Sequence, residues 1–242
     1  MCIASVQDGR AGLPPSTDTK MITPAMVSAA EGAVSPGASL QQAAADTDRT
    51  VTCYLKVVNT TRFPLTDCYV STQGGELQIP PSNIGPGTAE AMVARKKAWG
   101  TSGTYGTVSW RVGDTRYRLV VMWHCPWDFV FNDANWLGMG IVKEGAGMKE
   151  KQPTWYDIMY TDVDWNPSTK ESWRQNYDGL DFHSQRFHSD ITPLSFRCVH
   201  GGFQAEGTMS NGHNATAKIT LVPLEKDDFA PAIKKELKSK GY

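Results

Sequence analysis

The sequence lacks the features that mark several large classes of protein. No run of 18 apolar residues occurs among its 242 residues, so no transmembrane helix is predicted. The formal net charge is only −1, which argues against a nucleic-acid-binding protein that neutralises many phosphates. The length suits one large β domain or two small ones with ample room for a core. We therefore expect a globular chain with no nucleic-acid partner.

An apolar signal-peptide core is also missing from residues 1–20, where Asp8, Arg10 and Asp18 interrupt the chain. Either a signal has been removed, or the protein leaves the cell by another route, or it stays inside. Two glycosylation triplets begin at Asn59 and Asn214, but such triplets often arise by chance. They give only weak support for secretion.

Cysteine is scarce and odd in number. The five cysteines are Cys2, Cys53, Cys68, Cys125 and Cys198. This count and the wide spacing define no disulfide framework. Cys53 and Cys68 fall in strands that we expect to be adjacent and can form a bridge, but buried thiols are the favoured interpretation.

Catalytic and cofactor-binding motifs are absent. The sequence has no Gly-x-Ser-x-Gly motif, no phosphate-binding loop and no dinucleotide fingerprint. His183, His188 and His200 have no metal-ligand spacing, and we interpret them as surface residues of a long loop. The sequence therefore predicts a protein that is not an enzyme and that needs no cofactor or metal.

From Val51 onward, short segments alternate between apolar and polar residues and are separated by turn residues. The expected strands cover residues 51–58, 67–72, 89–96, 104–112, 116–125, 136–142, 202–209 and 215–222. Asn211-Gly212 is a strong hairpin signal between the last two of them. Short strands at this spacing predict an all-β fold, a β-sandwich over residues 51–224. Residues 162–193 look polar and irregular.

Two short helices are expected to flank the sandwich. Thr23-Pro24 is a favourable helix start, and the helical pattern runs to Ala45 with an interruption at Pro36. It lies in an otherwise flexible N-terminal segment, residues 1–50. Residues 153–160 form the second candidate, and residues 225–242 form a charged tail that can also become helical.

Aromatic residues are concentrated in the middle of the chain, and all eight tryptophans lie within residues 99–173. Pro126 ends an expected strand, and aromatic residues continue beyond it into a loop. These residues are Trp127, Phe129 and Phe131. Loops on a rigid scaffold carry binding residues, and tryptophan favours the boundary between membrane and water.

Tyr156 and Tyr160 are four residues apart in the second helical candidate, so they share one helix face. Two aromatic rings on one face can attract a quaternary ammonium group, which choline headgroups carry. The alternative is that both tyrosines merely pack the helix against the sandwich.

Four segments carry a resemblance to a known family. The first is residues 100–110, and the second is Pro-Trp-Asp-Phe at 126–129 followed by Asn135-Trp136. The third is Tyr-Asp-Ile-Met-Tyr at 156–160, and the fourth is the glycine–histidine hairpin at 207–213. Together they resemble the actinoporins, the pore-forming cytolysins of sea anemones with relatives in molluscs and other animals. The resemblance covers about residues 50–160 and 200–223.

This resemblance implies a protein that is secreted, binds sphingomyelin or phosphocholine lipids of a target cell membrane, and assembles as a homo-oligomer into cation-permeable pores. The positions that match the family's phosphocholine pocket are Thr72, Tyr105, His124, Pro126, Trp136, Tyr156 and Tyr160. Trp127, Phe129 and Phe131 match the aromatic residues that enter the membrane interface. Among the pocket positions, His124 replaces a serine and Tyr105 replaces a small aliphatic residue.

The family's N-terminal helix lines the pore, and residues 24–45 take that place here. Fully helical, 22 residues would span about 33 Å, against about 30 Å for the hydrocarbon core of a bilayer. Pro36 and the alanine-rich apolar face weaken this helix. Two other functions stay open: a non-lytic lipid- or carbohydrate-binding module related to fungal fruit-body lectins, and an intracellular protein that binds lipid surfaces.

Overall fold

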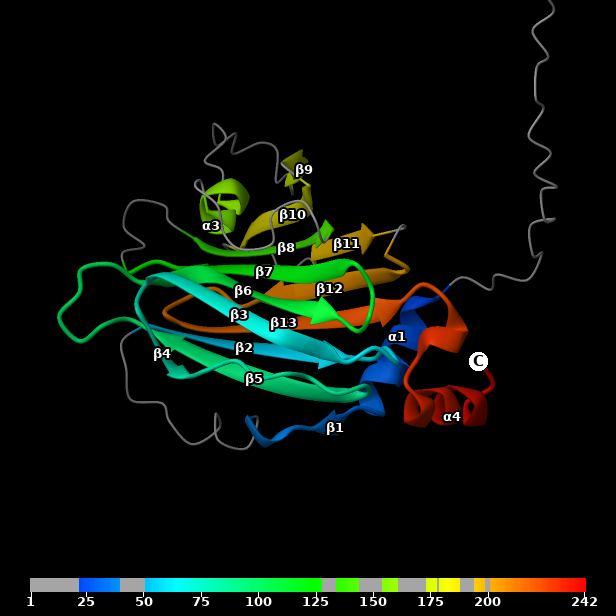
Figure 1. Cartoon of the computed structure of the whole chain (residues 1–242). Coiled ribbons are helices and arrows are strands. Elements are labelled where there is room, and N and C mark those ends of the chain that lie inside the picture. Colours follow the sequence, from blue (N-terminus) through cyan, green and yellow to red (C-terminus); the bar gives the residue numbers. More distant parts are fainter. Residues whose placement is uncertain are drawn as a thin grey trace, which may run out of the picture.

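Two β-sheets packed face to face form the body of the protein (Figure 1). The computed structural model describes residues 22–39, 51–127, 134–143, 154–160, 173–177, 179–187, 194–198 and 201–242, and only the backbone of 173–177 and 194–198. No helix in these ranges is long and apolar enough to cross a membrane. The predicted all-β sandwich is confirmed.

The first sheet is built around the parallel pair β2 and β13. Its spatial order is β1 (Ser35–Pro36), β5 (Thr88–Arg95), β2 (Thr52–Asn59), β13 (Asn214–Pro223), β12 (Phe203–Met209) and β11 (Leu194–Cys198), with β4 (Glu76–Ile79) paired to β5. The second sheet has the order β3 (Leu65–Gly74), β6 (Thr104–Val112), β7 (Tyr117–Cys125), β8 (Asn135–Lys143), β10 (Leu180–Phe187) and β9 (Trp173–Tyr177). The strands expected from the sequence all form, with ends that differ by no more than two residues.

The expectation that residues 162–193 are irregular is wrong for β9 and β10, which complete the second sheet. Strand β10 alternates buried Leu180, Phe182 and Ser184 with partly exposed polar residues. That alternation is typical of a strand with one covered face. Polar side chains on the other face concealed it in the sequence.

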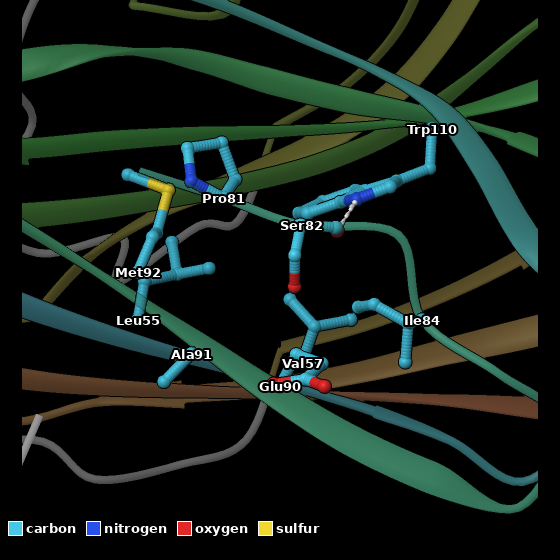
Figure 2. A pocket seen from close by; sticks show the side chains of 9 residues that line it. All are labelled: Leu55, Val57, Pro81, Ser82, Ile84, Glu90, Ala91, Met92 and Trp110. Atoms are coloured by element: carbon cyan, nitrogen blue, oxygen red, sulfur yellow. Dashed lines mark hydrogen bonds between the residues drawn. The ribbon is translucent and has the colours of Figure 1, made fainter. Parts of the chain in front are cut away.

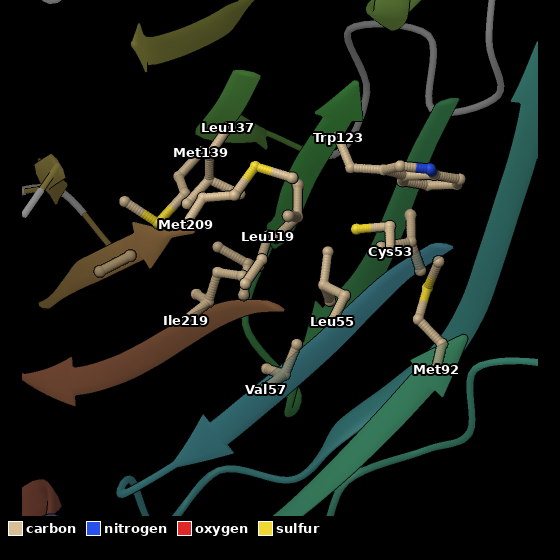
Figure 3. Packing of buried hydrophobic residues seen from close by; sticks show 14 of the residues in the cluster. Cys53, Leu55, Val57, Met92, Leu119, Trp123, Leu137, Met139, Met209 and Ile219 are labelled. Atoms are coloured by element: carbon tan, nitrogen blue, oxygen red, sulfur yellow. The ribbon is translucent and has the colours of Figure 1, made fainter. Parts of the chain in front are cut away.

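The main core fills the space between the sheets, where side chains from both inner faces meet (Figure 3). Trp123 and Leu119 of β7 face Leu55 of β2 and Ile219 of β13, and all four are fully buried. Truncating one such leucine to alanine typically costs about 2–5 kcal/mol of stability.

Three cysteines in the described residues are free thiols, so the bridge between Cys53 and Cys68 does not form. Cys53 and Cys125 are buried in the core, and Cys68 is half-buried. Burial raises the pKa of Cys125, with a further increase from neighbouring Cys53. Burial also raises the pKa of Cys68 to about 12, although Arg118 opposes the change.

The first helix, α1 (Pro24–Gly32), begins at Thr23, whose hydroxyl accepts a hydrogen bond from the amide of Met26 at 3.2 Å. Proline at the first helical position has a favourable φ and loses no hydrogen bond there. The helix ends at Gly32, and Ser35–Pro36 pairs with β5 as a short parallel strand, β1. A continuous helix over residues 24–45 is therefore not present, and residues 40–45 lie outside the described residues.

The C-terminal tail forms a short 3-10 helix (Lys226–Asp228) and the helix α4 (Pro231–Ser239). Helix α4 packs on α1 at one end of the sandwich (Figure 1). A separate apolar cluster joins the two helices to the first sheet: Met26, Val27, Ala30, Val222, Phe229, Ala230, Ile233 and Leu237. The third helix, α3 (Trp155–Met159), lies over the second sheet, away from α1 and α4.

Candidate functional site

A row of side chains crosses the outer face of the second sheet. In the strand register, Tyr105 of β6 pairs with His124 of β7, His124 with Trp136 of β8, and Trp136 with Arg186 of β10. Directly paired residues project from the same face of a sheet. Their chain neighbours Trp123 and Leu137 belong to the core between the sheets, so the row faces outward.

Helix α3 places two tyrosines over this row. A capping box fixes its first turn, in which the Thr154 hydroxyl accepts from the amide of Asp157 and the Asp157 carboxylate accepts from the amide of Thr154. Tyr156 is 7% exposed, whereas Tyr160 is half-buried. Tyr160 follows the last residue of the helix, and its amide donates to the carbonyl of Tyr156 at 2.8 Å, so the two tyrosines lie on one side of α3, as the sequence predicted.

The rings of these residues, here named the aromatic cluster, are in direct contact. Its members are Tyr105, His124, Trp136, Tyr156 and Tyr160. The ring centroids of Tyr156 and Tyr160 are 5.3 Å apart, those of Tyr105 and Tyr156 are 5.1 Å apart, and those of His124 and Tyr160 are 4.5 Å apart. Trp136 meets Tyr160 edge-on at 5.1 Å. Such contacts between rings stabilise the packing of α3 on the sheet.

Thr72 and Pro126, the other two residues predicted for the pocket, are not members of the aromatic cluster. Thr72 of β3 pairs with Gly106, which pairs in turn with Trp123 of the core, so the register places Thr72 on the opposite face of the sheet from Tyr105. Pro126 follows the end of β7 and is buried. Gly74 is paired with Tyr105, and a Cβ atom at Gly74 would lie 2.2 Å from the Tyr105 ring. The glycine thus allows that ring to lie across β3.

His124 is electrically neutral in the folded protein at pH 7. Burial, and to a smaller extent the nearby positive charge of Arg186, lower its pKa to about 4. Its Nδ1 atom lies 2.7 Å from the Tyr156 hydroxyl. When that hydroxyl donates to Nδ1, the ring proton is on Nε2. Nε2 is buried and has no hydrogen-bond partner among the described residues.

Arg186 brings a positive charge to the edge of the aromatic cluster. Its guanidinium carbon lies 4.5 Å from the centroid of the Trp136 ring. This is the geometry of a cation–π contact, which holds the side chain in place. Sequence reasoning missed Arg186 because it belongs to β10, in the segment that looked irregular.

Trp127, predicted to enter a membrane interface, lies at the end of the sandwich and is 40% exposed. Its ring stacks on His213 with a centroid distance of 5.8 Å, and its carbonyl lies 2.9 Å from His213 Nε2. The Lys96 ammonium lies 4.3 Å from the centre of the same ring. Phe129 and Phe131, the other two interface candidates, lie outside the described residues.

Asn135 is a second residue that sequence reasoning did not interpret. Its fully buried amide donates hydrogen bonds to the carbonyls of Ser210 at 2.8 Å and Gly212 at 2.9 Å. These bonds fasten the β12–β13 hairpin to the start of β8. The hairpin thereby holds His213 against Trp127.

A small pocket elsewhere is a weaker candidate site. It lies between β2, β5 and the loop before β5, and its lining is mostly apolar (Figure 2). The indole nitrogen of Trp110 donates to the carbonyl of Ser82 at 2.8 Å and closes one side. The Glu90 carboxylate accepts a hydrogen bond from the Ser39 amide at 3.0 Å, so it binds the N-terminal segment of the chain. Within the described ranges, no group of three His, Cys, Asp or Glu residues is arranged to hold a metal ion.

Several known proteins are similar to this chain, although no family model matches it. Echotoxin-2 of Monoplex parthenopeus is 31% identical over 231 residues, which cover 93% of this chain and 77% of the toxin. Conoporin-Cn1 of Conus consors is 32% identical over 86% of this chain and 79% of its own length. Tereporin-Ca1 of Terebra anilis is 32% identical over 73% of this chain and 87% of its own length.

The crystal structure of the lipid-binding protein Nakanori has a similar fold. Its TM-score is 0.51 at 14% sequence identity, over 76% of this chain and 75% of Nakanori. The predicted β-sandwich therefore has a counterpart among experimental structures. The molluscan relatives are pore-forming toxins and not enzymes. This confirms the prediction that the chain is not an enzyme. At this identity over most of its length, the chain belongs to the actinoporin-like family of molluscan pore-forming toxins.

Proposed function

We propose that this protein binds the phosphocholine headgroup of sphingomyelin and related lipids, assembles on a target cell membrane outside the producing cell, and opens cation-permeable pores there. The observation that carries the proposal is the aromatic cluster with Arg186 at its edge. The two parts of this site match the two charges of a phosphocholine group.

The choline part suits the aromatic rings. Because the rings contact one another, a trimethylammonium group would bind on the outer faces of the half-buried Tyr105 and Tyr160 rather than between the rings. A cation on an aromatic face gains about 0.5–2 kcal/mol, depending on how well it is desolvated. Neutral His124 adds no positive charge to repel it.

The phosphate part suits Arg186 and His124. The guanidinium of Arg186 can donate to phosphate oxygens in a planar arrangement, and hydrogen bonds between charged groups are stronger than neutral ones. The Nε2 atom of His124 is buried and has no described partner, so it can donate to the same phosphate once the rings that cover His124 move aside. A ligand that satisfies this donor removes the cost of leaving it unpaired.

Membrane contact begins with Trp127, which is exposed at the end of the sandwich. Tryptophan partitions well into the interfacial region of a bilayer. Phe129 and Phe131 are assigned to the same contact from the family resemblance alone. Subunits bound to one membrane then associate.

Pore opening requires the N-terminal segment to leave the sandwich. Three sets of contacts hold it: the apolar cluster with α4, the Glu31 carboxylate with Lys218 at 2.5 Å and with the Thr220 hydroxyl, and β1 paired with β5. Beyond β1, the Ser39 hydroxyl also donates to the Glu90 carboxylate and accepts from the Ala91 amide at 2.7 Å. These contacts must break before residues 24–45 can form one helix with a polar side facing the pore. The names of the molluscan relatives support pore formation in general.

Binding of soluble phosphocholine, followed by isothermal titration calorimetry, tests the headgroup site. We expect binding to the intact protein and a loss of at least about tenfold in affinity for the double variant Tyr156→Ala and Tyr160→Ala, because the cation loses its rings. Tyr242→Ala is the matched control, since Tyr242 is exposed beyond α4. Equal affinity in a folded double variant would remove the aromatic cluster from the mechanism.

Deletion of residues 1–46 separates the pore-forming proposal from the lectin-like alternative. A pore former loses vesicle permeabilisation and keeps headgroup binding, because its binding site lies in the sandwich. A lectin-like module keeps its whole function without this segment, and it binds sugars in place of phosphocholine.

A further inference from the structure

Trp99 is the most exposed large apolar residue in the described part of the chain, with 99% of its surface accessible. It lies in the loop between β5 and β6, which projects from the end of the sandwich opposite α1 and α4 (Figure 1). Single apolar residues on a surface are common and by themselves mark no site. The hydrogen bonds, neighbours and charge of its loop distinguish Trp99 from such single residues.

One hydrogen bond fixes the start of the loop, and a second forms within it. The amide of Lys96 donates to the carbonyl of Val51 at 2.9 Å, and the amide of Gly100 donates to the carbonyl of Lys97 at 3.1 Å. The second hydrogen bond closes a tight turn in which Ala98 and Trp99 are exposed. A turn that holds an indole in solvent loses little further freedom when the indole binds.

The same loop contacts the predicted membrane-interface residue. The Lys96 ammonium lies over the ring of Trp127, which also stacks on His213. Trp99, three residues after Lys96, therefore belongs to the same end of the sandwich as Trp127. Two tryptophans from different loops therefore project at one end of the protein.

The charge of the loop is positive. Residues 96–102 contain Lys96 and Lys97 and no acidic residue. Arg95, just before them, is paired with Glu76 at 2.8 Å, whereas Lys97 is exposed. An exposed indole beside an exposed ammonium matches the lipid interface, where an aromatic ring lies at headgroup depth and lysine meets phosphate.

We propose that the β5–β6 loop is a second membrane contact, in which Trp99 enters the lipid interface and Lys97 meets lipid phosphates. The inference rests on the proposed membrane function. Together with Trp127 it gives two points of contact, which fix the orientation of the sandwich on the bilayer.

This orientation bears on the N-terminal segment. Val51, where the sandwich begins, is hydrogen-bonded to Lys96 and therefore lies beside the membrane-facing loop. When residues 24–45 leave the sandwich, the point at which they remain attached is already next to the lipid. The segment need not pass around the domain to reach the bilayer.

The test compares Trp99→Ala with Thr101→Ala, a change at an exposed position of the same loop. Partitioning onto vesicles of sphingomyelin and phosphatidylcholine is measured by flotation, and affinity for soluble phosphocholine is measured by calorimetry. We expect Trp99→Ala to weaken partitioning about tenfold, because an indole is lost from the interface, and to leave soluble phosphocholine affinity unchanged. Thr101→Ala should change neither quantity.

A second variant keeps bulk at the position while removing the indole. Trp99→Phe should retain most of the partitioning but reduce the quenching of protein fluorescence by brominated lipids, because one interfacial tryptophan is missing. Lys97→Ala should weaken partitioning about threefold on vesicles that contain phosphatidylserine, and high salt should abolish that difference.

The outcomes separate this inference from the proposed function. Failure of the intact protein to bind either vesicles or phosphocholine overturns the proposed function and this inference with it. If the intact protein binds vesicles and phosphocholine, and Trp99→Ala partitions onto vesicles as strongly as the intact protein, only the second membrane contact is overturned. Normal partitioning of Trp99→Ala with impaired dye release would instead make the loop a contact between subunits, and it would overturn the membrane assignment.

Discussion

The hydroxyl of Tyr156 lies 2.7 Å from Nδ1 of His124, so a hydrogen bond joins helix α3 to strand β7 inside the aromatic cluster. The bond has two consequences. It holds α3 on the sheet, and when the hydroxyl donates to Nδ1, the ring proton of His124 is on Nε2, where a ligand can accept it. Structure and recognition therefore depend on the same pair.

Removing only the hydroxyl tests this pair. Tyr156→Phe should lower the free energy of unfolding by about 1–2 kcal/mol, because a buried hydrogen bond is lost and Nδ1 is left without its partner. It should also weaken phosphocholine binding, since the tautomer of His124 is no longer fixed. Urea denaturation and calorimetry measure the two effects, with Tyr242→Phe as the control. A variant as stable as the intact protein would show that the bond does not hold α3 in place.

The lowered pKa of His124 predicts a dependence of stability on pH. Its folded pKa of about 4 lies below its ordinary value, so the unfolded chain takes up a proton first as the pH falls. The contribution of His124 to the free energy of unfolding is fully present above about pH 6.5. About 3 kcal/mol of it is lost between about pH 6.5 and 4.

Chemical denaturation across this range, compared between the intact protein and His124→Gln, isolates the contribution of His124. The variant cannot titrate at this position, so its stability should fall less over the window, while all other acidic and basic groups are shared. If the free energy of unfolding depended on pH in the same way in both proteins, the lowered pKa of His124 would be contradicted.

Helix α4 is predicted to hold the N-terminal helix α1. Ile233 is fully buried between them, and Ile233→Ala should cost about 2–4 kcal/mol through the lost contacts and the cavity. Hydrogen exchange should show weaker protection of the α1 amides, and dye release from vesicles should begin sooner. Lys235→Ala, at an exposed position of the same helix, should change neither result. Unaltered protection of the α1 amides in the Ile233 variant would show that α4 does not hold α1 in place.

The buried thiols predict slow chemical modification. Cys53, Cys68 and Cys125 should resist alkylation at pH 8 in the folded protein, because Cys53 and Cys125 are buried and the raised pKa values of Cys68 and Cys125 leave little thiolate. Peptide mapping of protein alkylated before and after unfolding shows which residues react. A disulfide between Cys53 and Cys68 in unreduced protein would contradict the structure.

Most of the sandwich could be predicted from the sequence because each strand repeats a local pattern. Strands β6, β12 and β13 alternate between apolar and polar residues, β7 is a largely apolar run, and strong turn signals separate β6 from β7 and β12 from β13. Strand β10 was missed because polar Asp181, His183 and Gln185 occupy the face opposite its buried residues Leu180 and Phe182. The short helix α1 ends where Pro36 and its neighbours make β1, as the proline suggested.

The site was only partly predictable, since its members meet through strand register and not through sequence spacing. Tyr156 and Tyr160 share a helix face, which spacing reveals, and the family resemblance added His124 and Trp136. Arg186 reaches the site because it pairs with Trp136 across two strands, and no local signal shows this. The packing of α4 on α1 is equally non-local.

Dye release from vesicles is the most direct measurement of the central claim, that the aromatic cluster places a pore-forming chain on phosphocholine membranes. We expect the intact protein to release dye from vesicles of sphingomyelin and phosphatidylcholine, and the folded double variant Tyr156→Ala and Tyr160→Ala to release far less at the same concentration. Vesicle binding by the intact protein without any release, or equal release by both proteins, would contradict the account.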